Sequence, residues 1–252
     1  LSTKSSSLEE IKDYDFTICL VPSALMHHFE SNAEIEKIFY AIGQLGFDEV
    51  YNLSPFEAMA EEAFFKEEGP RISSFCPVCK RAIKYDYPTL LEQLSKVDYP
   101  SEIASRYYRK KYSDKTNMGI FLLCECSSKL LLAKHPYNNY QYETDHTLAI
   151  RDIFPLIKLN PSDKRKEVHL SYEGFSYSNV ESAFKCSSHL MADGLEKVID
   201  ILEKREIDRI NNFEHYSFYS CFNGCIGGDL LWGNPYSCKY NYQKIKCEDI
   251  RI

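Results

Sequence analysis

The stretch "DFTICLVP", residues 15–22, predicts the fold class. It is a continuous apolar run that ends at a proline, which is typical of a strand buried on both faces of a sheet. Residues 31–46 follow with apolar positions at helical spacing, with Ser31 or Asn32 able to cap the start and Gly46 able to end the helix. "FDEVYNL" then predicts a second strand. A strand, a helix and a strand in this order form a β-α-β unit, which implies a parallel sheet.

Three further predicted strands are each followed by cysteines. "RISSFC" runs into Cys76, "GIFLLCEC" ends at Cys126, and "HYSFYSCF" leads to Cys221 and Cys225. Ligands of open α/β sheets sit at the carboxyl ends of the strands. The four thiols are therefore expected to converge on one buried metal site.

The remaining pattern completes an α/β fold of two lobes, each a mostly parallel twisted sheet flanked by helices, with the metal site at the seam. Residues 1–12 are expected to be a polar lead-in, 13–100 a first lobe with the first cysteine motif, and 101–252 a second lobe with the other two. Further helices are expected over about 55–68, over "PTLLEQLSKV", over "SEIASRYYRKKYSD" with Ser101 as its cap, within 147–159 up to Pro155, and over "DGLEKVIDILEKREIDRI".

Size and charge exclude several classes of function. The chain has 252 residues, 44% of them hydrophobic, which is enough to bury a large core. Its formal net charge of −7 argues against nucleic acid and anionic membrane surfaces as partners. The apolar runs are too short to span a bilayer and no signal peptide opens the chain, so a cytoplasmic location is expected. The chain begins without Met, which predicts a fragment of a larger protein.

Ten cysteines are many for this length. Disulfides are disfavoured in a reducing compartment, where clustered cysteines more often bind metal. Structural zinc sites usually take two close pairs within a few dozen residues, whereas these motifs are spread over residues 76–225. A [4Fe–4S] cluster needs four thiolates and accepts them from distant segments. Zinc and an iron–sulfur cluster both stay open at this point, and the spacing favours the cluster.

The motif "CFNGCIGG", residues 221–228, resembles the last cysteine motif of the [FeFe]-hydrogenase large subunit. "SSFCP" at 73–77 resembles that family's T-S-C-C-P, and "CECSSK" at 124–129 resembles its P-C-x-A-K. "LVPSAL" at 20–25 resembles the loop beneath the family's diiron site. The likeness covers roughly residues 15–245, with the motifs in the family's order.

The resemblance implies roles for individual residues. The implied ligands of a [4Fe–4S] cluster are Cys76, Cys126, Cys221 and Cys225. Cys225 would also bridge to a diiron subcluster that carries carbonyl and cyanide ligands. Lys129 would donate a hydrogen bond to one cyanide, and Pro22 and Ser23 would contact the other. A cation and small polar groups suit an anionic group of this kind.

The sequence departs from the family where protons are handled. Phe75 stands where hydrogenases carry the cysteine that relays protons, and phenylalanine cannot ionise. Cys79, three residues after Cys76, is a substitute relay candidate, although a buried thiol on the following helix is the simpler interpretation. Cys124 and Tyr219 replace methionines, and Trp232 is expected to reshape the wall near the cluster.

The stretch "GGDLLWGNPY", residues 227–236, replaces the G-G-G-Q-P of catalytic members and resembles the endings of the family's sensory members. The expected function is a [4Fe–4S]-binding domain that senses redox state or H2, with a possible diiron group and weak or no H2 turnover. Ferredoxin-like, PAS or other signalling domains are the expected partners, either in the full-length chain or in trans. H2 and protons are expected as ligands if the diiron group is present. The expected source is an anaerobe. The alternatives are an active hydrogenase, a non-enzymatic iron–sulfur assembly protein and a zinc-structured interaction module. The assembly factors carry extra N-terminal cysteines, and residues 1–18 contain none.

Overall fold

A four-stranded parallel sheet forms one half of the molecule. The computed structural model describes residues 5–132, 142–157 and 188–241. In the first sheet, β1 (Phe16–Val21) lies between β2 (Glu49–Asn52) and β4 (Met118–Cys124), and β5 (His146–Ala149) pairs with β4. All three strand pairs are parallel. The strand predicted at 15–22 is therefore confirmed as a central strand of this sheet.

The predicted β-α-β unit is confirmed around β1. Helix α2 (Asn32–Gly43) connects β1 to β2, and the Ser31 side chain accepts a hydrogen bond from the backbone N–H of Glu34 at its start. The turn after this helix passes through Gly46, whose φ of 116° favours glycine. Along β1, Cys19 and Val21 belong to the core on the α2 side of the sheet.

The opposite face of the first sheet is covered by α3 (Ser54–Phe65) and α5 (Pro100–Lys111). Ile18 and Leu20 of β1 point to this side and belong to the same core as Phe56 and Tyr108. The strand is thus apolar on both faces, as a continuous apolar run requires. Helix α5 begins at Pro100 and has Tyr99 as its N-cap residue, so the expected cap at Ser101 is wrong. Proline suits the first turn of a helix because it has no backbone N–H that would need a partner.

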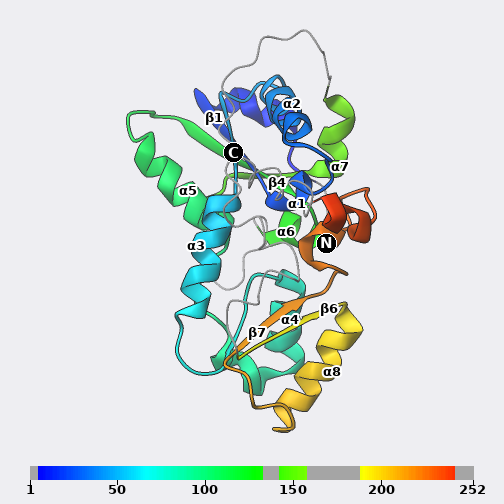
Figure 1. Cartoon of the computed structure of the whole chain (residues 1–252). Helices are drawn as coiled ribbons and strands as arrows, with labels where there is room; N and C mark the ends of the chain where they lie inside the picture. Colours follow the sequence, from blue (N-terminus) through cyan, green and yellow to red (C-terminus); the bar gives the residue numbers. More distant parts are fainter. Residues whose placement is uncertain (1–4, 133–141, 158–187, 242–252) are drawn as a thin grey trace, which may run out of the picture.

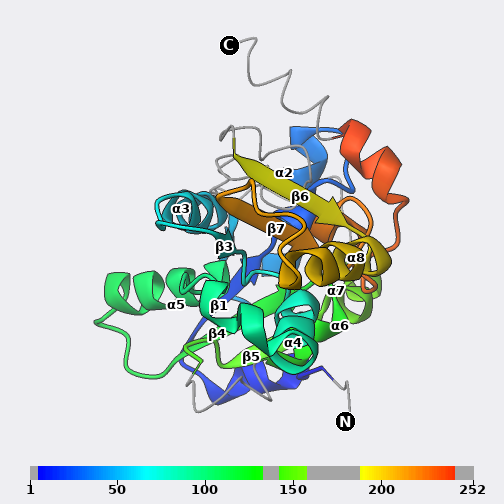
Figure 2. The same ribbon diagram turned by 90° about the horizontal axis from the view of Figure 1, so that it is seen from below.

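A smaller parallel sheet forms the other half of the molecule (Figure 1). Its order is β3 (Arg71–Ile72), β7 (His215–Tyr219) and β6 (His189–Asp193). Tyr216 and Phe218 of β7 pack with α4 (Pro77–Asp86) and α8 (Leu195–Glu206), which lie together on one side of β6 and β7 in Figure 2. His215 faces α3 instead, where its ring contacts Phe64. Helix α3 therefore packs against both sheets.

The fold class is confirmed as two parallel sheets flanked by helices, but the division expected at residues 100 and 101 does not follow the sheets. Strand β3 and helix α4 precede residue 100 and lie with the second sheet. Strands β4 and β5 follow residue 100 and lie in the first. Each sheet is thus assembled from both halves of the chain.

Shorter elements complete the described part of the chain. The polar lead-in includes η1 (Leu8–Asp13), which opens with a capping box between Ser7 and Glu10. The other short elements are α1 (Ser23–Met26), η2 (Pro88–Gln93), α6 (Ser127–Leu132), α7 (Ile150–Ile153), η3 (Phe154–Leu156) and η5 (Gly224–Gly227). Across the described ranges, no helix has the length and apolarity that crossing a membrane requires.

Candidate metal centre

The cysteines of the three motifs line one cavity of about 270 Å³. They are Cys76, Cys126, Cys221 and Cys225. Each follows the carboxyl end of a parallel strand: β3 for the first, β4 for the second and β7 for the last two. The structure thus brings together the thiols that sequence reasoning selected, at the carboxyl ends of strands from both sheets, where ligands of α/β sheets are usually found. Their role as ligands stays a prediction.

Local backbone structure positions each thiol. Cys76 is the N-cap residue of α4, and its Sγ lies 3.5 Å from the hydroxyl of Ser220. Cys126 immediately precedes α6, and its Sγ accepts a hydrogen bond of 3.4 Å from the backbone N–H of Lys129. Cys225 lies within η5, which follows a left-handed residue, Asn223. The thiols are therefore held by helix starts and a tight turn rather than by long loops.

The second and third motifs are in direct backbone contact. The carbonyl oxygen of Glu125 accepts a hydrogen bond of 3.0 Å from the N–H of Leu230. A Cβ added at Gly228 would lie 2.2 Å from that same oxygen. Since a side chain cannot occupy this space, glycine at 228 allows the chain after Cys225 to lie against the chain before Cys126.

The environment of the thiols differs between the first motif and the others. Burial raises the pKa of Cys126, Cys221 and Cys225, so these thiols hold their protons in the metal-free protein. A hydrogen bond from the Cys79 side chain lowers the pKa of Cys76 to about 5. Thiolates are the form that binds metal, so occupation of the site must release protons from three of the four cysteines.

The side chains that these motifs bring to the cavity form a set of four thiols. Among the residues that the structure describes, no three His, Cys, Asp or Glu side chains are grouped closely enough to hold one metal ion. A [4Fe–4S] cluster takes four thiolates and accepts them from distant segments. The number and type of donors therefore agree with such a cluster, and the metal that they hold stays a prediction.

Lys129 and Glu125 form a buried ion pair beside Cys225. The ammonium of Lys129 donates to a carboxylate oxygen of Glu125 and to the Sγ of Cys225, the latter at 3.8 Å. Glu125 is 1% exposed. Sequence reasoning selected Lys129 and gave Glu125 no role. The spacing of four residues between Glu125 and Lys129, at which a carboxylate and an ammonium can pair, was the available signal.

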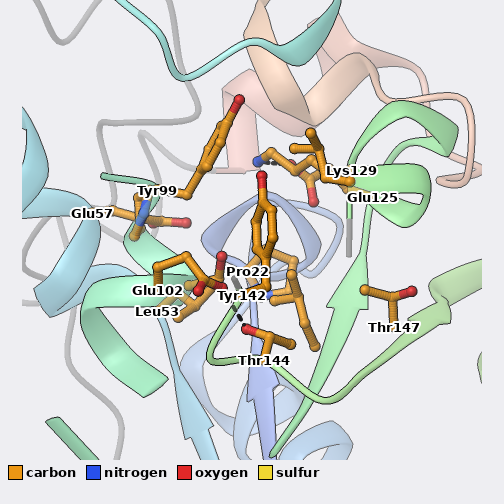
Figure 3. A pocket seen from close by; sticks show the side chains of 14 residues that line it. Pro22, Leu53, Glu57, Tyr99, Glu102, Glu125, Lys129, Tyr142, Thr144 and Thr147 are labelled. Atoms are coloured by element: carbon orange, nitrogen blue, oxygen red, sulfur yellow. Dashed lines mark hydrogen bonds and ion pairs between the residues drawn. The ribbon is translucent and has the colours of Figure 1, made fainter. Parts of the chain in front are cut away.

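A second, smaller pocket of about 30 Å³ adjoins the cysteine cavity and shares Glu125 and Lys129 with it. Pro22 lines this pocket. The backbone N–H of Ser23 donates a hydrogen bond of 3.3 Å to Oε1 of Glu57, which is buried. Burial raises the pKa of Glu57 to about 7. Figure 3 shows Glu125 and Lys129 together on one side of the pocket, and Glu57 on the other. Glu57 was missed because it sits among several glutamates of α3 that look alike in sequence.

The remaining predicted residues have different locations. The ring of Phe75 packs edge-on against Phe64 at 5.9 Å, in a small apolar core outside the cavity lining. Cys79 is fully buried in α4, as the simpler interpretation held. Tyr219 lines the cysteine cavity, whereas Cys124 belongs to the core of the first sheet. Trp232 lies outside the lining of the cysteine cavity: it is 48% exposed, and its ring centroid lies 4.1 Å from that of Phe154, so its expected effect near the cluster stays a prediction.

The model of the iron-only hydrogenase large subunit, C-terminal domain, matches residues 17–216. The chain belongs to this family. The matched range includes the first two cysteine motifs and Lys129, and the structure adds the third motif, which lies just beyond it.

Relatives of this hydrogenase family share both sequence and fold with the chain. Iron hydrogenase 1 of Clostridium pasteurianum is 27% identical over 192 residues, which are 69% of this chain and 33% of that protein. The chain thus spans about a third of the length of this relative. A variant of an [FeFe]-hydrogenase from Chlamydomonas reinhardtii superposes with a TM-score of 0.70 at 13% identity, over 95% of this chain and 88% of the other.

A second [FeFe]-hydrogenase structure, described as revealing stepwise H-cluster assembly, superposes with a TM-score of 0.69 at 13% identity, over 95% of this chain and 88% of that one. At this level of identity the likeness establishes the hydrogenase fold alone. The resemblance to the family drawn from the cysteine motifs is therefore confirmed, and the fold agrees with it.

Glu57 makes the stability of this hydrogenase-like chain depend on pH. Its pKa is about 7 in the folded protein against an ordinary value of 4.5, so the folded state binds the proton more tightly than the unfolded state. Tighter proton binding by Glu57 stabilises the folded state fully below pH 4.5, and this contribution is lost as pH rises through about 7. The loss in the free energy of unfolding is about 3 kcal/mol. Glu57→Gln should therefore gain stability over the wild type as pH rises across this window.

Urea unfolding of the metal-free protein under anaerobic conditions at pH 5 and pH 8 checks this expectation. The matched control is Glu62→Gln, an exposed glutamate on the same helix that pairs with Lys66. Its free energy of unfolding should keep a nearly constant difference from the wild type. The prediction is contradicted if the free energies of unfolding of Glu57→Gln and the wild type differ by the same amount at pH 5 and at pH 8.

Proposed function

We propose that this chain is a [4Fe–4S]-binding, hydrogenase-like domain that responds to redox state and has weak or no H2 turnover. The observation that carries the proposal is the arrangement of four cysteines, from three remote segments, around one cavity that suits a cluster. A [4Fe–4S] cluster supplies one-electron chemistry. The protein's own residues would hold it, exclude water from most of its surface and set its potential.

The surroundings of the first motif support low H2 turnover. Rapid proton reduction needs a proton donor within hydrogen-bond reach of the metal. Phe75 occupies the position before Cys76, and its ring is buried in an apolar core. The thiol of Cys79 is fully buried in α4 and its pKa is raised, chiefly by its hydrogen bond to Cys76. Neither side chain offers a mobile proton to the cavity.

A sensor needs partners that receive its signal. We place the domain in the cytoplasm of an anaerobe, with ferredoxin-like, PAS or other signalling domains that exchange electrons with it or read its state.

Anaerobic reconstitution with iron and sulfide tests the cluster. We expect about four irons and four sulfides per chain, and after reduction an electron paramagnetic resonance signal of a [4Fe–4S] cluster. Protein expressed in zinc-rich medium should bind little zinc. Tight binding of one zinc with no iron uptake would instead establish the zinc-structured alternative.

Hydrogen evolution from a reduced mediator separates a sensor from an active hydrogenase, the second candidate, which family membership favours. The assay uses protein that has been exposed to hydrogenase maturases, with Cys76→Ala as the control. We expect the two rates to be equal. A rate well above that of the control would establish an active hydrogenase and overturn the proposal of a sensor.

A further inference from the structure

Glu125 lies at the boundary between the cysteine cavity and the smaller pocket, and it lines both. It stands where the resembling family motif, P-C-x-A-K, has proline, so the carboxylate is a feature of this chain. Its backbone is fixed by the contact with Gly228 and by the hydrogen bond from Leu230. Its side chain is 2% exposed and pairs with Lys129. The carboxylate is thus held in place and shielded from solvent.

The charges around the two cavities are strongly unequal. Among the described residues that line either one, Lys129 is the only lysine or arginine. The carboxyl side chains that line them are Glu57, Glu102, Glu125 and Asp229. Asp229 accepts hydrogen bonds from Ser127, and Glu102 accepts them from Glu143 and Thr144. The Glu125 carboxylate accepts a hydrogen bond from the ammonium of Lys129, and the same ammonium donates to the Sγ of Cys225.

The Glu125 carboxylate already places one negative charge beside Lys129 and Cys225, and a second anionic group does not fit there. The diiron group of the family is anionic because it carries cyanides, and the resemblance assigns Lys129 as the cation that binds it. In this chain the ammonium is already shared between Glu125 and the thiol of Cys225. A further negative charge would lie close to a buried carboxylate, where repulsion is weakly screened, and would find no other cation in the described lining.

We propose that Glu125 determines which cofactor this site accepts: its carboxylate holds Lys129 and excludes an anionic diiron group, so the chain carries the [4Fe–4S] cluster alone. This inference rests on the proposed function, because it requires the cluster to form. Glu125 acts here through Lys129 and through its own charge, as a positioning and specificity residue. The domain then responds to electrons and not to H2.

The test compares cluster-loaded wild type with Glu125→Gln. Each is incubated anaerobically with a synthetic diiron dithiolate complex that carries carbonyl and cyanide ligands, and is then desalted. Infrared bands of the bound carbonyl and cyanide groups, together with iron content, report retention. We expect the wild type to retain almost none and Glu125→Gln to retain about tenfold more, since the carboxylate that pairs with Lys129 and repels an anionic group is then gone. The matched control is Glu102→Gln, which removes a buried carboxyl from the same small pocket and should behave as the wild type.

The midpoint potential of the cluster gives a second readout. Removing the Glu125 carboxylate takes one negative charge from beside Lys129 and Cys225, so the potential of Glu125→Gln should lie above that of the wild type. If Glu125→Gln fails to assemble a cluster, Glu125→Ala is measured in its place.

Three results would overturn the inference: full retention of the diiron complex by the wild type, equal retention by the wild type and the Glu125 variant, or a gain in Glu102→Gln as large as in Glu125→Gln. An unchanged midpoint potential would overturn the role of Glu125 in balancing Lys129. Failure of the wild type to assemble any cluster is a different outcome, because it contradicts the proposed function itself.

Discussion

Replacing Cys126 with alanine is expected to abolish cluster assembly. Among the described residues, neither neighbouring cysteine lines the cavity in its place, because Cys124 is buried in the core of the first sheet and Cys79 lies in α4. Three thiolates leave one iron without a protein ligand, and the cluster is then lost during purification. Iron after reconstitution should fall from about four per chain to below about one.

The matched control for this prediction is Cys19→Ala. Cys19 is as fully buried as any residue of β1 but belongs to the core on the α2 side, away from the cavity. The control should keep its iron and its electron paramagnetic resonance signal, with a loss of about 1 kcal/mol in the free energy of unfolding from the smaller side chain. A Cys126→Ala protein with full iron content would remove this cysteine from the ligand set.

Substituting Gly228 with alanine is expected to have the second-largest effect. The new Cβ would lie 2.2 Å from the carbonyl oxygen of Glu125 and 3.1 Å from that of Cys225, and both obstacles are backbone atoms that cannot rotate away. The chain after Cys225 must then move off the chain before Cys126. We expect a loss of about 3 kcal/mol or more in the free energy of unfolding, and loss of the cluster because its ligands separate.

Gly43→Ala is the control for the glycine substitution. Gly43 ends α2, and a Cβ there would meet its nearest neighbour, Val50, at 3.6 Å, an ordinary contact. In a helix this change should be neutral or stabilise by about 0.5–1 kcal/mol. Thermal unfolding and iron content of the two variants measure the contrast. A Gly228→Ala protein as stable and as rich in iron as Gly43→Ala would contradict the close approach of the two motifs.

The parts of the fold that sequence predicted well are those with long apolar runs. Strands β1, β4 and β7 are buried along almost their whole length, and cysteines follow the carboxyl ends of β4 and β7. Strand β5 was missed because its four residues run directly into α7, and the pair presents a helical pattern. Strand β6 was missed because it is short and three of its five residues are apolar or small beside polar neighbours.

The candidate site was predicted better than the boundaries of the fold. Cysteines carry a strong signal, since few other roles place several of them after strand ends. The lobe boundary expected between residues 100 and 101 does not follow the two sheets. No local sequence pattern indicates that β3, a strand of two residues, pairs with β7 in the second sheet. Glu57 and Glu125 could not be assigned from sequence with similar force, because burial of a carboxylate depends on packing between remote segments.

The interleaving of the two sheets has a consequence for biosynthesis. The central strand of the small sheet, β7, begins at residue 215, so the peptide that carries Cys76 has no partner strand until most of the chain has left the ribosome. The candidate site is therefore complete only once Cys221 and Cys225, which follow β7, have been synthesised. A product that ended before residue 221 would present Cys76 and Cys126 without the other two thiols that line the cavity.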